Sequence, residues 1–110
     1  MTRSGTSRPY ASLRRGLDIR KVRRIGTRRR VGGITVFAAP GSDSPRVAFV
    51  AGRKVGNAVQ RNRAKRRLRE AVRRVPLRSG RDYVVIASAS VVEVPFETLV
   101  SWTRAAMSEE

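Results

Sequence analysis

The side chains in this sequence that could take part in chemistry are almost all cations. The 110 residues include 25 Lys and Arg but only 8 Asp and Glu, which gives a net charge of +17 at pH 7. The densest group lies between Arg61 and Arg74, where Glu70 is the only acid. Guanidinium groups match phosphate in a bidentate way and stack on bases. A surface this basic repels itself and attracts polyanions, so we expect a nucleic-acid partner.

The missing residue types exclude most catalytic chemistry. The sequence has no Cys and no His, which removes thiolate nucleophiles, disulfides, the usual general base near pH 7 and the commonest metal ligands. The central acids Asp18, Glu70 and Asp82 are too scattered for a two-metal nuclease site. We expect Asp82 to belong to a turn and Glu70 to pair with a nearby arginine. The arginines within reach of Glu70 are Arg66, Arg73 and Arg74. The sequence therefore predicts no catalytic and no metal-binding residues in this chain.

The cations fall into two blocks. Residues 1–31 hold eleven cations and one acid, and residues 53–81 hold twelve cations and one acid. The stretch between them is almost neutral, whereas residues 82–110 carry one cation and five acids. This asymmetry indicates one basic face rather than a uniform coat of charge.

The second block must be positioned by a helix, which we predict over Asn57–Val75. Asn57 is a good N-cap, Gln60 follows at the spacing of a capping box, and Pro76 ends the helix. One apolar stripe repeats at helical spacing. It consists of Ala64, Leu68, Ala71, Val72 and Val75.

The opposite side of this helix is cationic. Like charges at helical spacing repel, and cations in the first turn oppose the helix dipole. A solvated surface is the ordinary meaning of a charge run, but such self-repulsion makes more sense if a polyanion neutralises it. Arg53 and Lys54 precede the helix, whose N-terminus is itself a phosphate-binding feature. The residues opposite the apolar stripe are Asn62, Arg66, Arg69 and Arg73, with Arg63 beside them.

The remaining elements make a small α/β domain in the order α-β-β-β-α-β-α. The first helix spans Leu17–Ile25, presents Leu17, Ile19, Val22 and Ile25 as its apolar residues, and ends at Gly26. Strands are predicted at Thr27–Val31, Ile34–Ala39, Val47–Ala51 and Tyr83–Ala89, and a last helix starts at Val94–Pro95. We expect Ile34–Ala39 and Val47–Ala51 to pair as an antiparallel hairpin.

The expected domain organisation is simple. Residues 1–11 read as a flexible basic arm, residues 12–107 as a single RNA-binding α/β domain, and residues 108–110 as a tail. No apolar run is long enough for a membrane span, and the basic N-terminus lacks the apolar core of a signal peptide. We therefore expect a cytoplasmic protein with no membrane partner.

One stretch of the second block is similar to a known motif. The run KVGNAVQRNRAKRRLREAV, Lys54 to Val72, resembles the signature of the bacterial ribonuclease P protein family, with Arg61-Asn62-Arg63 at its core. The segment Leu13–Thr27 resembles that family's N-terminal helix. Arg46–Val47 and Asp82–Val85 resemble the strands on either side of the motif, so the resemblance covers about residues 12–102.

The resemblance implies a fold and a function. The fold is an α+β two-layer sandwich of ribosomal-protein type, with a left-handed β-α-β crossover around the motif helix. The function is that of the protein subunit of ribonuclease P, a ribonucleoprotein endoribonuclease that hydrolyses precursor tRNA and leaves a 5′-phosphate on the mature tRNA. Its RNA subunit performs the hydrolysis with Mg²⁺. The implied partners are that RNA and precursor tRNA, with no protein partner.

The resemblance also implies two groups of binding residues. The predicted contacts to the RNA subunit are Arg53, Lys54, Arg61, Asn62, Arg63, Lys65, Arg66, Arg69 and Arg73. The predicted leader set, which would hold the 5′ leader of the precursor, is Arg14, Ile19, Arg23 and Phe37. Two positions on the first helix where the family usually has Phe read Ile19 and Arg23, so this cleft is expected to stack bases less and attract phosphate more. Phe37 is equally consistent with a core aromatic.

Three alternatives stay open on the residues alone. The chain could be a structural RNA-binding protein of ribosomal type, a nucleoid-type DNA binder, or an autonomous nuclease. Composition does not separate the first of these from a ribonuclease P subunit, whereas the Arg-Asn-Arg signature does.

Overall fold

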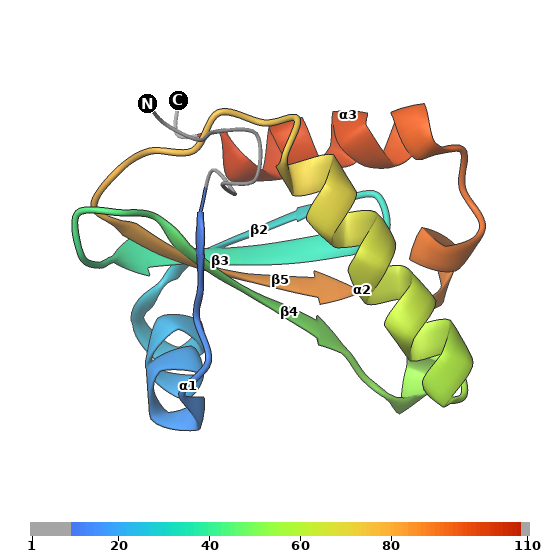
Figure 1. Ribbon diagram of the computed structural model, residues 1–110, viewed down its shortest axis with the longest axis horizontal. Coiled ribbons are helices and arrows are strands. Elements are labelled where there is room, and N and C mark those ends of the chain that lie inside the picture. The colour runs from blue at the N-terminus through green and yellow to red at the C-terminus, as the bar shows by residue number, and fades with distance from the viewer. Residues whose placement is uncertain (1–9, 109–110) are drawn as a thin grey trace, which may run out of the picture.

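The computed structural model describes residues 10–108, which form one five-stranded sheet with three helices (Figure 1). The predicted mixed α/β class is confirmed. The strands are β1 (Ala11–Ser12), β2 (Thr27–Val31), β3 (Ile34–Pro40), β4 (Arg46–Ala51) and β5 (Arg81–Ala87). The helices are α1 (Gly16–Ile25), α2 (Ala58–Val72) and α3 (Phe96–Met107), with 3₁₀ turns η1 (Arg53–Val55) and η2 (Ala89–Val92).

The strand order is β1-β4-β5-β3-β2, so the predicted hairpin of Ile34–Ala39 with Val47–Ala51 is wrong. β5 lies between these strands, antiparallel to β3 and parallel to β4. The physical reason is burial: Tyr83, Val84 and Val85 are 0% exposed, and a strand that is apolar on both faces belongs at the centre. β3 forms its hairpin with β2 instead, through Gly32, whose φ of 54° suits a tight turn.

The first strand is absent from the predicted elements. Ala11 and Ser12 pair in parallel with Arg46 and Val47 of β4, and Tyr10 beside them is buried. The described fold thus begins two residues before the expected domain start at residue 12. The rest of the predicted arm, residues 1–9, and residues 109–110 of the predicted tail lie outside the described residues.

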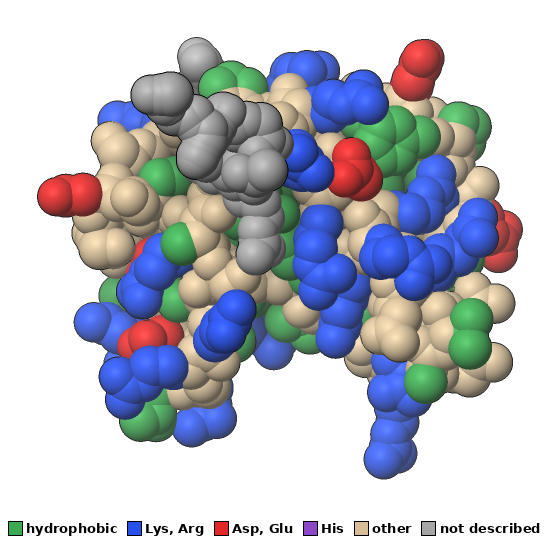
Figure 2. Space-filling view, in the orientation of Figure 1, with side chains coloured by type: hydrophobic (Ala, Val, Ile, Leu, Met, Phe, Trp, Pro, Cys, Tyr) green, Lys and Arg blue, Asp and Glu red, His purple; other side chains and the backbone are tan. Residues whose placement is uncertain are grey.

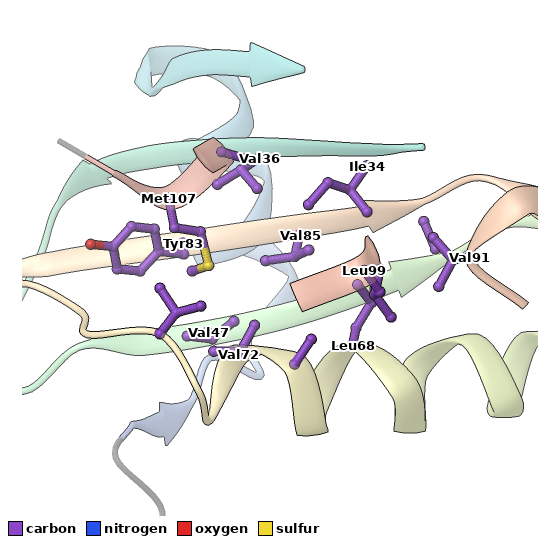
Figure 3. Packing of buried hydrophobic residues seen from close by; sticks show 14 of the residues in the cluster. Ile34, Val36, Val47, Leu68, Val72, Tyr83, Val85, Val91, Leu99 and Met107 are labelled. Atoms are coloured by element: carbon purple, nitrogen blue, oxygen red, sulfur yellow. The ribbon is translucent and has the colours of Figure 1, made fainter. Parts of the chain in front are cut away.

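Side chains alternate between the two faces of the sheet and build two clusters. The larger core lies between the sheet and helices α2 and α3, where Leu68 and Leu99 meet Val85 and its neighbours (Figure 3). The smaller cluster lies on the opposite face, where Val84 packs with Leu13 and Val22 under α1. Figure 1 shows α3 above the sheet and α1 below it. The single short helix leaves part of this second face uncovered: Phe37, Val50 and Ile86 are only partly buried there.

Helix α1 begins one residue before the predicted start and packs through fewer residues than expected. Val22 is buried and Ile19 is half-buried, whereas Leu17 and Ile25 are 65% and 51% exposed, so only part of the apolar spacing that indicated the helix is used in packing. Gly26 ends the helix as predicted. Its φ is −74°, and glycine is needed there because a Cβ would lie 2.5 Å from the Val22 carbonyl oxygen and 2.9 Å from that of Ala38.

Helix α2 starts as predicted, since the Asn57 side chain accepts a hydrogen bond of 3.0 Å from the Gln60 N–H. It ends at Val72 rather than Val75, although Val75 is still buried. β4, α2 and β5 form a crossover between neighbouring parallel strands, and its left-handed sense stays a prediction. Within residues 10–108, no helix is both long and apolar enough to cross a membrane.

Candidate nucleic-acid interface

The solvent side of α2 carries the predicted contacts to the RNA subunit. Ala64 and Leu68 are 0% exposed beneath the helix, and this burial turns the cations outward. None of the nine predicted residues is buried: Arg61 and Lys65 are half-buried and the other seven are exposed. Figure 2 shows Lys and Arg side chains gathered over α2 and also over α1. The structure therefore places these residues on η1, on α2 and, for Arg73, at the C-cap of α2, and none of the nine is buried.

Some of these cations also hold the protein together. Arg61 Nε donates a hydrogen bond of 3.1 Å to the Gly56 carbonyl, and Arg73 forms an exposed ion pair of 3.2 Å with Glu70, as expected. Arg67, which lies at the border of the cationic side, is structural: its guanidinium donates to the Val91 and Val94 carbonyls, at 2.7 Å for Val91. Within the described residues, Arg66 makes no hydrogen bond or ion pair through its side chain.

The turn before α2 brings two more cations to the helix N-terminus. Arg53 and Lys54 are exposed on η1, and the chain then passes through Gly56 at φ 137°, a conformation that other residues rarely adopt. Backbone N–H groups and the helix dipole favour an anion at such an end. The turn and the first turns of α2 thus bring several cations close to the N-terminus of this helix.

The predicted leader set is brought together in part. Phe37 lies on the sheet face that α1 covers, and the Arg23 guanidinium carbon sits 5.8 Å from its ring centroid. Ile19 and Phe37 are both half-buried against the smaller cluster. Phe37 is therefore neither a fully buried core aromatic nor an open platform. Arg14 is exposed and lines a separate cavity with Ile19, at the β1–β4 edge of the sheet.

Two residues on this face are missing from the predicted leader set. Arg28 is paired with Phe37 across the strands, and Arg30 is paired with Thr35, so both lie on the Phe37 side of the sheet, and both are exposed. Arg29 lies on the other face, where it donates to the Ala105 carbonyl at 3.3 Å and to the Ser108 carbonyl. Strand alternation alone puts Arg28 and Arg30 on one face of the sheet and Arg29 on the other. Which of these faces carries Phe37 depends on the register between β2 and β3, which the sequence does not give.

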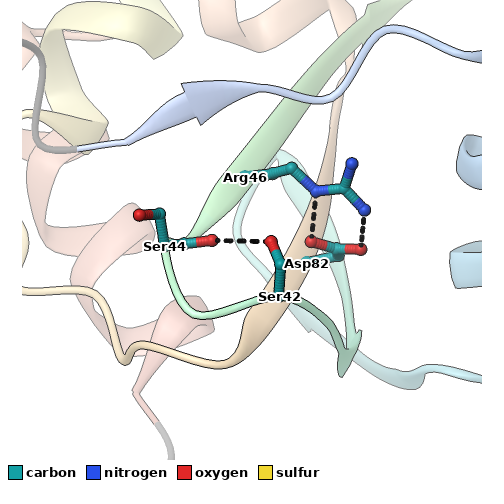
Figure 4. Close-up of polar contacts among 4 residues, drawn as sticks. All are labelled: Ser42, Ser44, Arg46 and Asp82. Atoms are coloured by element: carbon teal, nitrogen blue, oxygen red, sulfur yellow. Dashed lines mark hydrogen bonds and ion pairs between the residues drawn. The ribbon is translucent and has the colours of Figure 1, made fainter.

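Two of the described acids, Asp82 and Glu70, form ion pairs with arginines. Asp82 is wrong as a turn residue: it is a strand residue of β5, 5% exposed, and it pairs with Arg46 through Nε–Oδ1 and Nη2–Oδ2 distances of 3.0 and 2.7 Å (Figure 4). This hydrogen bonding raises the pKa of Arg46. Gly41 lies over the pair, where a Cβ would come within 2.4 Å of Asp82 Oδ1. No group of three or more His, Cys, Asp or Glu that could hold a metal occurs among residues 10–108.

Comparison with known proteins identifies the family of this chain. The Ribonuclease P family model matches residues 8–109. The chain is 45% identical over 91 residues to the ribonuclease P protein component of Chloroflexus aggregans, covering 79% of this chain and 67% of that protein. For the component from Paramagnetospirillum magneticum the identity is 39% over 104 residues, covering 86% and 78%.

Solved structures show the same arrangement of elements. The RNase P protein from Thermotoga maritima is similar with a TM-score of 0.77 and 27% sequence identity, covering 87% of this chain and 94% of that chain. The Staphylococcus aureus RNase P protein has a TM-score of 0.74 at 21% identity, covering 86% and 90%, a likeness of fold alone.

Proposed function

Because the chain belongs to the ribonuclease P protein family, we propose that it assists the 5′ maturation of tRNA by binding both the RNA subunit and precursor tRNA. The observation that carries this proposal is α2, a helix with a buried apolar side and exposed cations on the signature residues. A face that repels itself in isolation is stabilised when RNA phosphates neutralise it.

The two RNAs are assigned to different faces of the protein. The cations of α2 and η1 would bind the RNA subunit, as their positions in the signature suggest. The leader of the precursor would run over the sheet face beside α1, past Arg23 and Phe37. We add Arg28 and Arg30 to this leader path, because the register places them on the Phe37 side of the sheet. Arginines dominate this face, which favours contacts to leader phosphates over stacking of leader bases.

We assign the hydrolysis and its Mg²⁺ to the RNA subunit. The chain has neither His nor Cys, and Asp82 and Glu70 are engaged with Arg46 and Arg73. These pairs leave the protein a binding role, in which it orients the leader and neutralises phosphates near the RNA site. The site of action would be the cytoplasm, where tRNA is matured in bacteria.

The binding part of this proposal is tested by Arg66→Ala. We expect weaker binding to a bacterial ribonuclease P RNA and a log–log salt slope that is smaller in magnitude by about one unit, the signature of one lost phosphate contact. Arg104→Ala is the matched control, because it removes the same charge from α3 and should leave the slope close to that of the parent. An unchanged slope for Arg66→Ala would contradict the assignment of α2.

A general RNA binder of ribosomal type is the competing function. It predicts that unrelated structured RNAs compete as well as the ribonuclease P RNA at equal salt. A family-specific subunit predicts that the ribonuclease P RNA displaces both unrelated RNA and duplex DNA.

A further inference from the structure

A cavity of about 380 Å³ lies at the β1–β4 edge of the sheet, between α1 and α2. Its apolar walls include Leu13, Ile19 and Phe49, and its cations are Arg14 and Arg69. The cavity thus brings together Ile19 of α1, which belongs to the predicted leader set, and Arg69 of α2, which belongs to the predicted contacts to the RNA subunit. It is separate from the Arg23–Phe37 contact, because Phe37 is not among its lining residues.

Phe49 gives this cavity an oriented aromatic ring. The Tyr10 ring meets it edge-on, with centroids 5.9 Å apart and an interplanar angle of 63°. The Arg69 guanidinium carbon lies 5.7 Å from the Phe49 centroid. Phe49 remains partly exposed, so the ring is held by Tyr10 and Arg69 without being sealed into the core.

This combination selects a particular ligand chemistry. Aromatic rings and guanidinium planes are the two surfaces on which proteins stack unpaired bases. Arg14 and Arg69 make no ion pair within the described residues, so no carboxylate neutralises their charge. A volume of this size is at the low end of small-ligand sites, which suits one base rather than a duplex.

We propose that the Phe49–Arg69 cavity binds a single unstacked RNA nucleotide, its base against Phe49 and its phosphates on Arg14 and Arg69. The identity of that RNA rests on the proposed function. The nucleotide comes either from the precursor, whose leader would run beside α1, or from the RNA subunit, which would lie along α2. Both sources present the same chemistry, and binding measurements separate them.

The test uses Phe49→Leu in the full chain, with Phe96→Leu as the matched control. Phe96 is also half-buried and also lies under an arginine, with the Arg74 guanidinium carbon 5.2 Å from its ring, but it does not line the cavity. Two dissociation constants are measured: protein with ribonuclease P RNA, and reconstituted holoenzyme with precursor tRNA, with and without a leader.

We expect Phe49→Leu to weaken one of these interactions by about fivefold or more, the lower end of one base–aromatic stack. A loss confined to the RNA subunit assigns the nucleotide to that RNA, and a loss that depends on the leader assigns it to the precursor. No loss in either, or an equal loss for Phe96→Leu, would overturn the proposal. The parent protein is run in the same series, so its failure to bind or to support cleavage would count against the proposed function instead.

If Phe49→Leu does not fold, Phe49→Trp provides a second test. In Phe49→Trp, stacking of a base should quench the tryptophan emission at saturating RNA beyond the quenching of the parent, which reports Trp102 alone. Emission that changes no more than that of the parent would overturn the proposal.

Discussion

Arginine residues have two roles in this protein, and residue type alone does not separate them. Arg67 ties α2 to the carbonyls around η2, and Arg46 neutralises a buried carboxylate, whereas Arg66 lies in solvent. All three would look alike in a count of positive charge. Helical spacing did place Arg66 opposite the apolar side, which agrees with its exposure. No local pattern predicts the pairing of Arg46 with Asp82, because these residues are 36 positions apart.

The Arg46–Asp82 pair supports a prediction at this scale. Asp82→Asn should lower the free energy of unfolding by about 1–3 kcal/mol, because it leaves a partly desolvated guanidinium with one neutral partner. Glu70→Gln makes the same change in net charge but breaks a pair whose side chains are 44% and 56% exposed, and it should cost less than about 0.5 kcal/mol. Urea denaturation of both variants measures the difference, and equal midpoints would contradict it.

At the scale of elements, local signals predicted the helices better than they predicted the pairing of strands. The cap at Asn57 and the apolar repeat of α2 depend on neighbours in sequence, so both could be predicted. The insertion of β5 between β3 and β4 depends on residues more than thirty positions apart along the chain. The two-residue strand β1 is too short to carry a period and was missed for that reason.

Helix α1 shows how context overrides a periodic pattern. Among the described helices, it is the one that packs on this face of the sheet. The contact buries Val22 and partly buries Ile19, but it leaves Leu17 and Ile25 exposed. The pattern therefore indicated a helix correctly but exaggerated its apolar face. The same narrow contact leaves Phe37 half-buried on the sheet, a feature of the site that the sequence alone left open.

The burial of α2 gives the element-scale prediction. Leu68→Ala should reduce the free energy of unfolding by about 2–5 kcal/mol, since Leu68 is 0% exposed in the main core. Arg66→Ala, two residues away on the exposed side, should change it by less than about 0.5 kcal/mol. A Leu68→Ala variant as stable as the parent would show that the apolar side of α2 is wrongly assigned.

At the scale of the whole molecule, the candidate site has two parts: the cations of α2 and η1, and the sheet face beside α1. The nine predicted contacts to the RNA subunit could be grouped from the sequence because they lie within residues 53–73, and none of them is buried. The side of the sheet on which Arg28 and Arg30 lie depends on the register between β2 and β3, so the sequence could not place them on the Phe37 side. The separation of Arg14 from Phe37 depends on where β1 joins the sheet, which the sequence also did not predict.

The net charge of +17 predicts opposite effects of salt on folding and on binding. Raising KCl from low to moderate concentration should raise the Tm of the free protein, because screening weakens its self-repulsion. The same change should weaken binding to RNA, because releasing counterions into a more concentrated salt solution gains less free energy. Thermal melts and binding titrations over one salt series measure both. A Tm that falls with salt would show that attractive ion pairs, rather than repulsion, dominate the free protein.

Reconstitution tests the central claim most directly. The purified chain is mixed with a bacterial ribonuclease P RNA at a Mg²⁺ concentration too low for the RNA alone, and cleavage of a precursor tRNA is followed at its 5′ junction. We predict correct cleavage by the mixture and none by the protein alone. Binding of the RNA without restored cleavage would contradict the role of a ribonuclease P subunit, and cleavage by the protein alone would contradict the assignment of hydrolysis to RNA.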